Sequence, residues 1–294
     1  MNWETQGQGW PNRASSRFVQ AGSLRWHVQI MGEGPTLLLL HGTGAATHSW
    51  RDLMPLLARN FTVVAPDLPG HGFTEAPRPE LMSLAGQARL LGRLLDQLAM
   101  KPMIAIGHSA GAALLARMTL DGSIAPAAMI SLNGALLPLK GPSSQIFPAA
   151  ARLLAAGTLV PRLFSLHAGN RAWLRHFMDN TGSKIDREGI RLYQQLLSDP
   201  GHVSSALRMM AHWQLDTLTP SLPELDCRVM LVGGEVDRMI PPKATLEVGR
   251  LLPGAELVML PGLGHLAHEE RPDLVAGLTE RLFAESVPAL RLAC

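Results

Sequence analysis

Short apolar runs recur along this 294-residue chain and alternate with longer stretches of mixed character. Within most runs polar and apolar residues do not alternate, which is typical of strands buried on both faces of a parallel sheet. The runs predict strands at residues 18–19, 24–30, 36–40, 61–65, 103–106, 128–132, 229–232 and 257–260.

Between several of these runs, apolar residues return at helical spacing. Residues 50–60 place Leu53, Leu56 and Leu57 on one face, and residues 81–100 form a long amphipathic stretch. Strands that alternate with helices predict an α/β fold, in which helices cover both faces of a mostly parallel sheet.

Residues 135–221 interrupt this alternation, because they contain helical segments and no clear strand. Open α/β sheets bind ligands beyond the carboxyl ends of their strands. We therefore interpret residues 135–221 as a helical cap inserted over that edge. The first part of the core is then residues 1–134, and the second part is residues 222–294.

Composition narrows the classes of function. Hydrophobic residues make up 47% of the chain, enough for a large core, and the formal net charge of +2 gives no case for a nucleic-acid partner. The two cysteines, Cys227 and Cys294, do not suggest a disulfide or a zinc site. Residues 1–13 lack a signal-peptide pattern, and no apolar run approaches the roughly 18 residues of a membrane span. We expect a cytoplasmic protein without a transmembrane segment or metal site. Loose association with a membrane is the alternative, because residues 146–164 are apolar with scattered arginines.

One pentapeptide has the pattern of a nucleophile elbow, Gly107-X-Ser109-X-Gly111. It follows a predicted strand and precedes an alanine- and leucine-rich helix, which is the context that this motif requires. The tight turn needs small residues at 107 and 111 and lifts the serine hydroxyl clear of the sheet. The sequence therefore predicts that Ser109 is a nucleophile.

A serine hydroxyl needs a base, and the base needs an orienting acid. Asp237 follows the predicted strand 229–232, and His265 follows the predicted strand 257–260. All three residues leave carboxyl ends of strands in the chain order Ser, acid, His, so we predict the catalytic triad Ser109, Asp237 and His265.

Other residues compete for these roles. Glu235 could replace Asp237 but sits nearer the strand end, whereas Asp226 precedes its strand and belongs at the opposite edge. His268 better fits a capping or surface role. Asp67 fits a turn in which its carboxylate bonds backbone amides.

Acyl transfer also needs donors for the developing oxyanion. The amide of Ala110, directly after the nucleophile, is one candidate, and the amide of Thr43 is the other. Glycines at 42 and 44 let the backbone turn its amides toward the pocket.

Two histidines lie next to the predicted nucleophile and oxyanion loop in the sequence and are candidates for contact with a substrate. His41 begins the oxyanion loop and is better suited to support it by hydrogen bonds than to act as a base. His108 precedes the nucleophile, and we expect it to support the catalytic residues from behind.

Methionine and aromatic side chains in the cap suggest a large apolar pocket, although each one also fits packing between cap helices. His202 and His212 in turn fit either ligand contact or an ordinary surface or core position. The pocket candidates are Met209, Met210 and Trp213, together with Phe164, Trp173 and Phe177.

The elbow, the oxyanion loop, the acid and histidine loops and the cap resemble the α/β-hydrolase superfamily across nearly the whole chain. Longer strings resemble the magnesium chelatase accessory proteins of bacteriochlorophyll biosynthesis, the BchO type. This resemblance implies a photosynthetic bacterium, a porphyrin or its ester as small-molecule substrate or ligand, and magnesium chelatase as a partner. The strings lie at residues 10–13, 41–51, 107–112, 181–183, 200–203 and 209–213.

The leading hypothesis is a serine hydrolase that cleaves an ester or thioester of a bulky apolar substrate and needs no metal or organic cofactor. Hydrolysis of a carbon–carbon bond would use the same triad. Dehalogenase and epoxide hydrolase chemistry is disfavoured, because those relatives need a carboxylate at position 109. The alternative from another class is a non-catalytic porphyrin-binding or magnesium chelatase accessory protein that keeps the fold.

Overall fold

The structure is a computed structural model that describes residues 1–138, 159–168 and 170–287. Most of the cap segment lies within these ranges, whereas residues 139–158 and Cys294 lie outside them.

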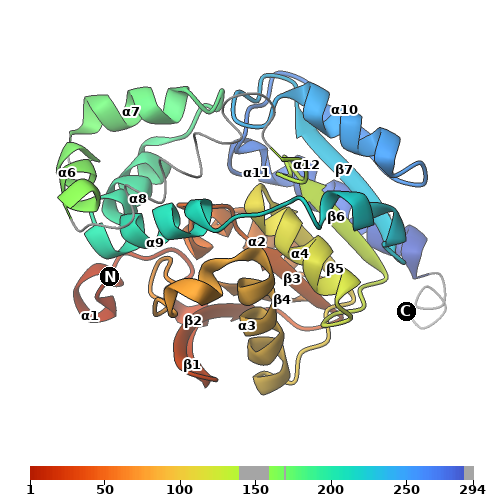
Figure 1. Cartoon of the computed structure of the whole chain (residues 1–294), viewed down its shortest axis with the longest axis horizontal. Helices are drawn as coiled ribbons and strands as arrows, with labels where there is room; N and C mark the ends of the chain where they lie inside the picture. The colour runs from red at the N-terminus through yellow and green to blue at the C-terminus, as the bar shows by residue number, and fades with distance from the viewer. Residues whose placement is uncertain (139–158, 169, 288–294) are drawn as a thin grey trace.

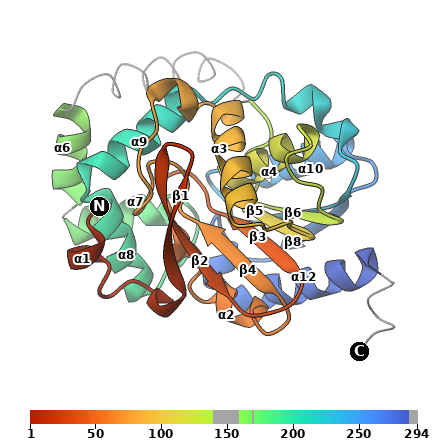
Figure 2. The ribbon, with the colours of Figure 1, turned by 90° about the horizontal axis from the view of Figure 1, so that it is seen from below.

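Within the described residues, eight strands form one sheet in the order β1-β2-β4-β3-β5-β6-β7-β8 (Figures 1 and 2). β1 pairs antiparallel with β2, and β2 pairs antiparallel with β4, whereas every other neighbouring pair is parallel. The predicted α/β fold with a mostly parallel sheet is confirmed. The strands are β1 (Ser16–Ala21), β2 (Leu24–Met31), β3 (Thr36–Leu40), β4 (Thr62–Pro66), β5 (Ile104–His108), β6 (Ala128–Leu132), β7 (Arg228–Gly234) and β8 (Glu256–Leu260).

Helices connect these strands and build the cap. They are α1 (Trp3–Gln6), α2 (Leu53–Leu57), α3 (Leu84–Gln97), α4 (Ala110–Leu120), α6 (Leu159–Ala168), α7 (Arg171–Asp179), α8 (Arg187–Leu197), α9 (Pro200–Ala211), α10 (Pro242–Leu251), α11 (Ala267–Glu270) and α12 (Pro272–Ser286). Short 3₁₀ turns lie at Arg13–Ser15, Thr47–Trp50, Pro79–Met82 and Thr219–Glu224.

Two predicted helices are shorter than their apolar patterns suggested. α2 covers only the middle of residues 50–60, because residues up to Trp50 form a 3₁₀ turn. α3 starts at Leu84 because the hydroxyl of Ser83 accepts a hydrogen bond from the amide of Gly86 and caps the helix.

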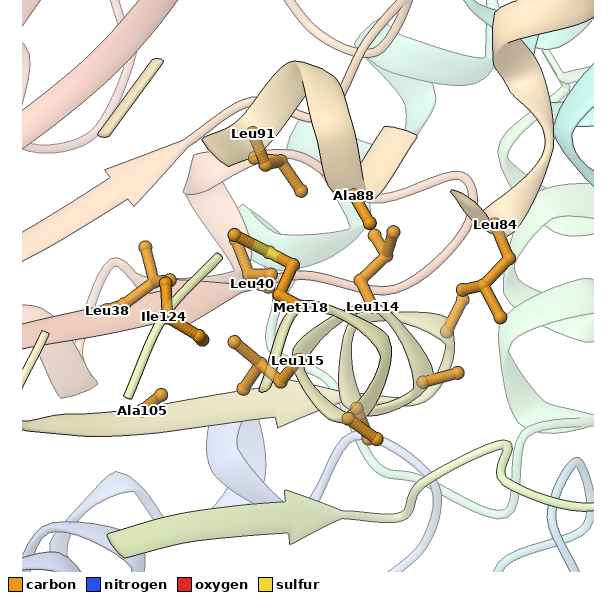
Figure 3. Packing of buried hydrophobic residues seen from close by; sticks show 14 of the residues in the cluster. Leu38, Leu40, Leu84, Ala88, Leu91, Ala105, Leu114, Leu115, Met118 and Ile124 are labelled. Carbon is orange, nitrogen blue, oxygen red and sulfur yellow. The ribbon is translucent and has the colours of Figure 1, made fainter. Parts of the chain in front are cut away.

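The core lies on both faces of the sheet, as the alternating directions of strand side chains require. Leu38 and Leu40 of β3 pack with α3 and α4 on one face, where Figure 3 shows Leu91, Leu114 and Met118 around them. The intervening side chains of β3 pack on the opposite face with α2 and α12. Burial of one such leucine contributes about 1.5–3 kcal/mol relative to an exposed one.

Helices α6–α9 lie between β6 and β7 in the chain and are grouped together beside the sheet (Figure 1). Their apolar cluster includes Ala45 and Leu266 from the core, next to the predicted oxyanion loop and to His265. The cap limits at residues 135 and 221 stay a prediction.

None of the helices within the described ranges is long and apolar enough to cross a membrane. The cytoplasmic location stays a prediction.

Candidate active site

Ser109 occupies a strained turn between β5 and α4. Its backbone has φ 51° and ψ −117°, a conformation that costs a residue with a side chain about 1–3 kcal/mol. A Cβ atom at Gly107 would overlap the backbone of Ala112, and one at Gly111 would overlap the carbonyl of Leu40. The elbow therefore has the shape that the pentapeptide predicts, and Ser109 is only partly buried.

Asp237 and His265 form a hydrogen-bonded pair at the ends of β7 and β8. Nδ1 of His265 donates to Oδ2 of Asp237 at 2.9 Å. The other carboxylate oxygen, Oδ1, accepts from the amides of Met239 at 2.8 Å and Ile240 at 2.9 Å. The loop thus holds one oxygen of the acid and leaves the other to orient the imidazole. Glu235, the competing acid, is exposed.

Asn133 is a further residue at this pair that the sequence patterns did not indicate. Its side-chain amide donates to Oδ2 of Asp237 at 2.7 Å and to the carbonyl of Gly264 at 3.3 Å. Asn133 is 1% exposed and has φ 47°, a left-handed conformation that asparagine tolerates better than most residues. The available signal was an asparagine directly after a buried strand, at the same edge as the predicted triad.

His108 lies behind His265. Its Nε2 donates to the carbonyl of His265 at 2.9 Å, and the two rings lie 4.7 Å apart. Burial, followed by the neighbouring histidines, lowers the pKa of His108 well below its ordinary value, so the ring is neutral. This agrees with a supporting role rather than a catalytic one.

The predicted capping or surface role for His268 is wrong. Its side chain is fully buried, 4.5 Å from the ring of His108 and 4.6 Å from that of Trp50, and its Nε2 lies 2.8 Å from Oγ of Ser49. Burial lowers the pKa of His268 to about 3. Short α11 follows the His265 loop inward rather than along the surface, which is why this histidine joins the core.

The oxyanion loop lies directly against the nucleophile. The amide of Ala45 bonds the carbonyl of Gly42 at 3.2 Å and closes a turn, in which Gly44 has φ 79°. A Cβ atom at Gly42 would lie 3.0 Å from Cβ of Ser109, so only glycine allows this approach. Ala110 begins α4, and amides in the first turn of a helix have no partner within that helix.

His41 braces this loop from the protein interior. Its Nδ1 donates to the carbonyl of Gly42 at 2.8 Å, while its Nε2 accepts from the amide of Leu68 at 2.9 Å. The ring is fully buried. Both ring nitrogens are occupied, which fits the supporting role proposed for it.

Asp67 has the structural role that its sequence context suggested. Its carboxylate accepts from the amides of Thr47 at 2.7 Å and Phe73 at 2.9 Å, and it pairs with His27 at 2.8 Å. Burial alone would raise the pKa of Asp67, but His27 and the amide donors outweigh it and hold the pKa below its ordinary value.

The cap residues divide into two groups. Met209 is fully buried, and its sulfur lies 3.6 Å from Oγ1 of Thr43, so it contacts the oxyanion loop. Met210 and Trp213 are partly buried. The aromatic residues Phe164, Trp173 and Phe177 pack on one another, with ring centroids 5.2–6.2 Å apart. This agrees with the second of the two predicted roles, packing between cap helices.

A buried polar cluster joins the cap to the core. Glu269 forms an ion pair with Arg51 at 2.8 Å and accepts from the hydroxyl of Tyr193 in α8 at 2.7 Å. Arg51 also contacts Asp186, the N-cap residue of α8, at 3.1 Å. Across the part of the chain that the structure describes, no group of three or more His, Cys, Asp or Glu side chains is placed to hold a metal ion.

Known proteins resemble this chain over most of its length. The profile of the alpha/beta hydrolase fold family matches residues 35–272. The magnesium-chelatase 30 kDa subunit of Rhodobacter capsulatus is 36% identical over 271 residues, which are 92% of this chain and 94% of that protein. An uncharacterized hydrolase of Bacillus subtilis (strain 168) is 27% identical over 258 residues, covering 85% of this chain and 90% of that protein.

The fold also resembles a solved structure of a serine hydrolase involved in carbazole degradation. The two chains superpose with a TM-score of 0.75 at 21% identity, over 92% of this chain and 98% of the other. At this level of identity the likeness concerns the fold alone.

Proposed function

The chain belongs to the alpha/beta hydrolase family and is similar to the magnesium-chelatase 30 kDa subunit of Rhodobacter capsulatus, and from this premise we propose that it is a serine hydrolase. One observation carries the proposal. The Asp237–His265 pair, with the acid held by two loop amides, lies at the same edge of the sheet as the strained elbow of Ser109.

In the proposed mechanism, Oγ of Ser109 attacks the carbonyl carbon of the substrate while Nε2 of His265 takes the hydroxyl proton. Asp237 keeps Nδ1 of His265 protonated and stabilises the imidazolium that forms. The amides of Thr43 and Ala110 donate to the oxyanion of the tetrahedral intermediate.

The intermediate then collapses. His265 gives its proton to the leaving group, and the acyl group remains on Ser109. A water molecule, deprotonated by His265, releases the acid product and restores the serine. The chemistry needs no metal ion or organic cofactor.

The proposed substrate is an ester or thioester with a bulky apolar group. Support comes from the buried apolar residues next to the oxyanion loop and to His265, which include Ala45, Leu266 and Met209. The identity to a magnesium-chelatase subunit supports a role in bacteriochlorophyll biosynthesis near magnesium insertion, with a porphyrin ester as one candidate substrate.

The first experiment is the intact mass of the protein after exposure to a fluorophosphonate. We expect one adduct on the wild type and none on Ser109→Ala, because only an activated serine reacts. With an ester that the wild type hydrolyses, Ser109→Ala should lower turnover by about three to six powers of ten. Equal turnover by the two proteins, or a folded wild type without adduct, would contradict the proposal.

A second candidate is a non-catalytic binder of porphyrin or of magnesium chelatase, and the similarity to a protein that is named as a magnesium-chelatase subunit favours it. Titration with protoporphyrin and its magnesium complex, followed by Soret absorbance and tryptophan fluorescence, distinguishes the two. Binding that persists in Ser109→Ala, without ester turnover by the wild type, would support the binder.

A further inference from the structure

Helix α9 of the cap reaches the oxyanion loop through His202. The ring is 2% exposed and lies in the first turn of α9, where its own amide donates to the N-cap residue Asp199 at 2.9 Å. One ring nitrogen, Nε2, lies 3.1 Å from the carbonyl oxygen of Gly44. The other, Nδ1, lies 3.1 Å from the amide nitrogen of Gly72.

These partners fix the protonation of the ring. The amide of Gly72 can only donate, so Nδ1 of His202 accepts and Nε2 carries the proton. Nε2–H then donates to the carbonyl of Gly44. Burial lowers the pKa of His202 to about 4, so the ring keeps this neutral form at neutral pH.

The bonded carbonyl belongs to the residue directly after Thr43. Gly44 has φ 79°, and the turn closed by Ala45 and Gly42 holds the other side of this short segment. A hydrogen bond to the carbonyl of Gly44 therefore limits rotation of the loop whose Thr43 amide is the proposed oxyanion donor.

A second contact comes from the same face of α9. Met209 follows His202 by seven residues, which is about two helical turns, and its sulfur lies 3.6 Å from Oγ1 of Thr43. Close packing also holds α9 against the loop that contains Gly72. A Cβ atom at Gly70 would lie 2.5 Å from Oγ of Ser205 in α9.

We propose that His202 is a positioning residue, through which cap helix α9 holds the oxyanion loop in the conformation that presents the Thr43 amide to Ser109. This inference rests on the proposed hydrolase function. In this arrangement, residues of the core and of the cap together position the oxyanion donors. Displacement of the cap therefore weakens transition-state stabilisation even where the Asp237–His265 pair is intact.

The test compares three substitutions that separate the two hydrogen bonds of His202. His202→Gln places an amide nitrogen where Nε2 stood and keeps the donor to Gly44. His202→Asn places its side-chain oxygen where Nδ1 stood, so it keeps only the acceptor for the amide of Gly72. His202→Phe removes both hydrogen bonds. The matched control is His212→Phe at the end of α9, whose ring bonds the carbonyl of Arg208.

With p-nitrophenyl butyrate as the probe, we expect kcat of His202→Phe and His202→Asn to fall about 10- to 100-fold. This loss is smaller than the roughly 100- to 1,000-fold that removal of an oxyanion donor costs, because the Thr43 amide is displaced and not removed. KM should change less than about threefold, because the donor acts mainly in the transition state. His202→Gln should recover kcat to within about fivefold of the wild type, and His212→Phe should match the wild type.

Wild-type kcat in His202→Phe, or equal losses in His202→Gln and His202→Asn, would overturn the role of His202. If His202→Phe does not fold, the comparison between the Gln and Asn variants still decides. Failure of the hydrolase proposal gives a different result. The wild type itself would then show no turnover, and its reaction with the fluorophosphonate would not differ from that of Ser109→Ala.

Discussion

At the scale of single residues, the orientation of Asp237 depends on neighbours that use different oxygens of its carboxylate. Two loop amides bond Oδ1, whereas His265 and Asn133 share Oδ2. The bond from Asn133 thus fixes the oxygen that faces the imidazole. A small rotation of this carboxylate would turn the imidazole of His265 out of the orientation that the proposed mechanism needs, and displacements of about 1 Å can cost about 100-fold in rate.

Asn133→Ala should therefore lower kcat about 10-fold for an ester that the wild type hydrolyses, with little change in KM. Asn133→Asp should do more, because a second carboxylate beside Asp237 raises the pKa of one of the two acids. The acid limb of the kcat/KM–pH profile should then move to higher pH in Asn133→Asp. An unchanged profile would show that Asn133 has only a structural role.

The strained backbone of Ser109 leads to a prediction about stability. Ser109→Gly should raise the free energy of unfolding by about 1 kcal/mol, because glycine adopts a positive φ without a steric penalty. Ser109→Ala keeps its Cβ atom and serves as the control without this gain. Urea unfolding of the three proteins measures the difference, and equal midpoints for Gly and Ala would mean that the elbow stores no such strain.

At the scale of elements, two of the attachments between the cap and the core differ in chemistry. Helix α9 bonds the oxyanion loop through neutral His202, whereas α8 is held by the cluster of Glu269, Arg51 and Tyr193. The carboxylate of Glu269 is fully buried, so its charge depends on these donors. Both attachments lie beside the residues proposed to react.

Arg51→Met should lower the free energy of unfolding by about 3–5 kcal/mol, because it leaves the carboxylate of Glu269 buried without its cation. The double variant Arg51→Met, Glu269→Met should recover part of that loss, since it buries no unpaired charge. Urea unfolding of both single variants and the double variant measures the coupling. Additive losses would contradict the buried ion pair.

At the scale of the whole molecule, buried neutral histidines should make stability depend on pH. Among the described residues, burial lowers the pKa of six histidines, with His202 at about 4 and His268 at about 3. The six are His41, His48, His71, His108, His202 and His268. They surround the loops of the candidate site rather than lying scattered through the fold.

The direction of this pH dependence of stability follows from proton binding. Below about pH 6.5 the unfolded chain protonates these histidines while the folded protein does not, so stability is complete above that pH and falls as pH decreases toward the folded pKa values. A histidine that stays neutral in the folded protein lowers the free energy of unfolding by up to about 1.4 kcal/mol per pH unit in this window. The urea midpoint should therefore drop steeply between pH 7 and about pH 5.

His48→Phe tests this dependence with one ring. Neither ring nitrogen of His48 has a hydrogen-bond partner among the described residues, and the ring packs 4.6 Å from that of Tyr193. In the variant, the free energy of unfolding should fall less steeply with decreasing pH, by about 1.4 kcal/mol per pH unit, and the variant should be more stable than the wild type at pH 5.5. A slope equal to that of the wild type would mean that His48 is protonated in the folded protein.

The sequence by itself determined the strands and the chemical types at the site. Apolar runs marked each of the eight strands found among the described residues, and glycine spacing marked the elbow around Ser109. The rule that functional residues follow strands selected Asp237 and His265, which the structure joins at 2.9 Å. These features are local, because a buried strand and a tight turn each restrict the residues that build them.

Tertiary structure alone decided the strand order and brought Asn133 and His202 to the site. Asn133 meets Asp237 across 104 residues of chain, and His202 meets Gly44 across 158. Such contacts depend on which strands are neighbours and on how the cap lies over them, and neither is encoded in a local pattern. His268 shows the same limit, because its position three residues after His265 suggested the surface, while the path of α11 buries it against Trp50.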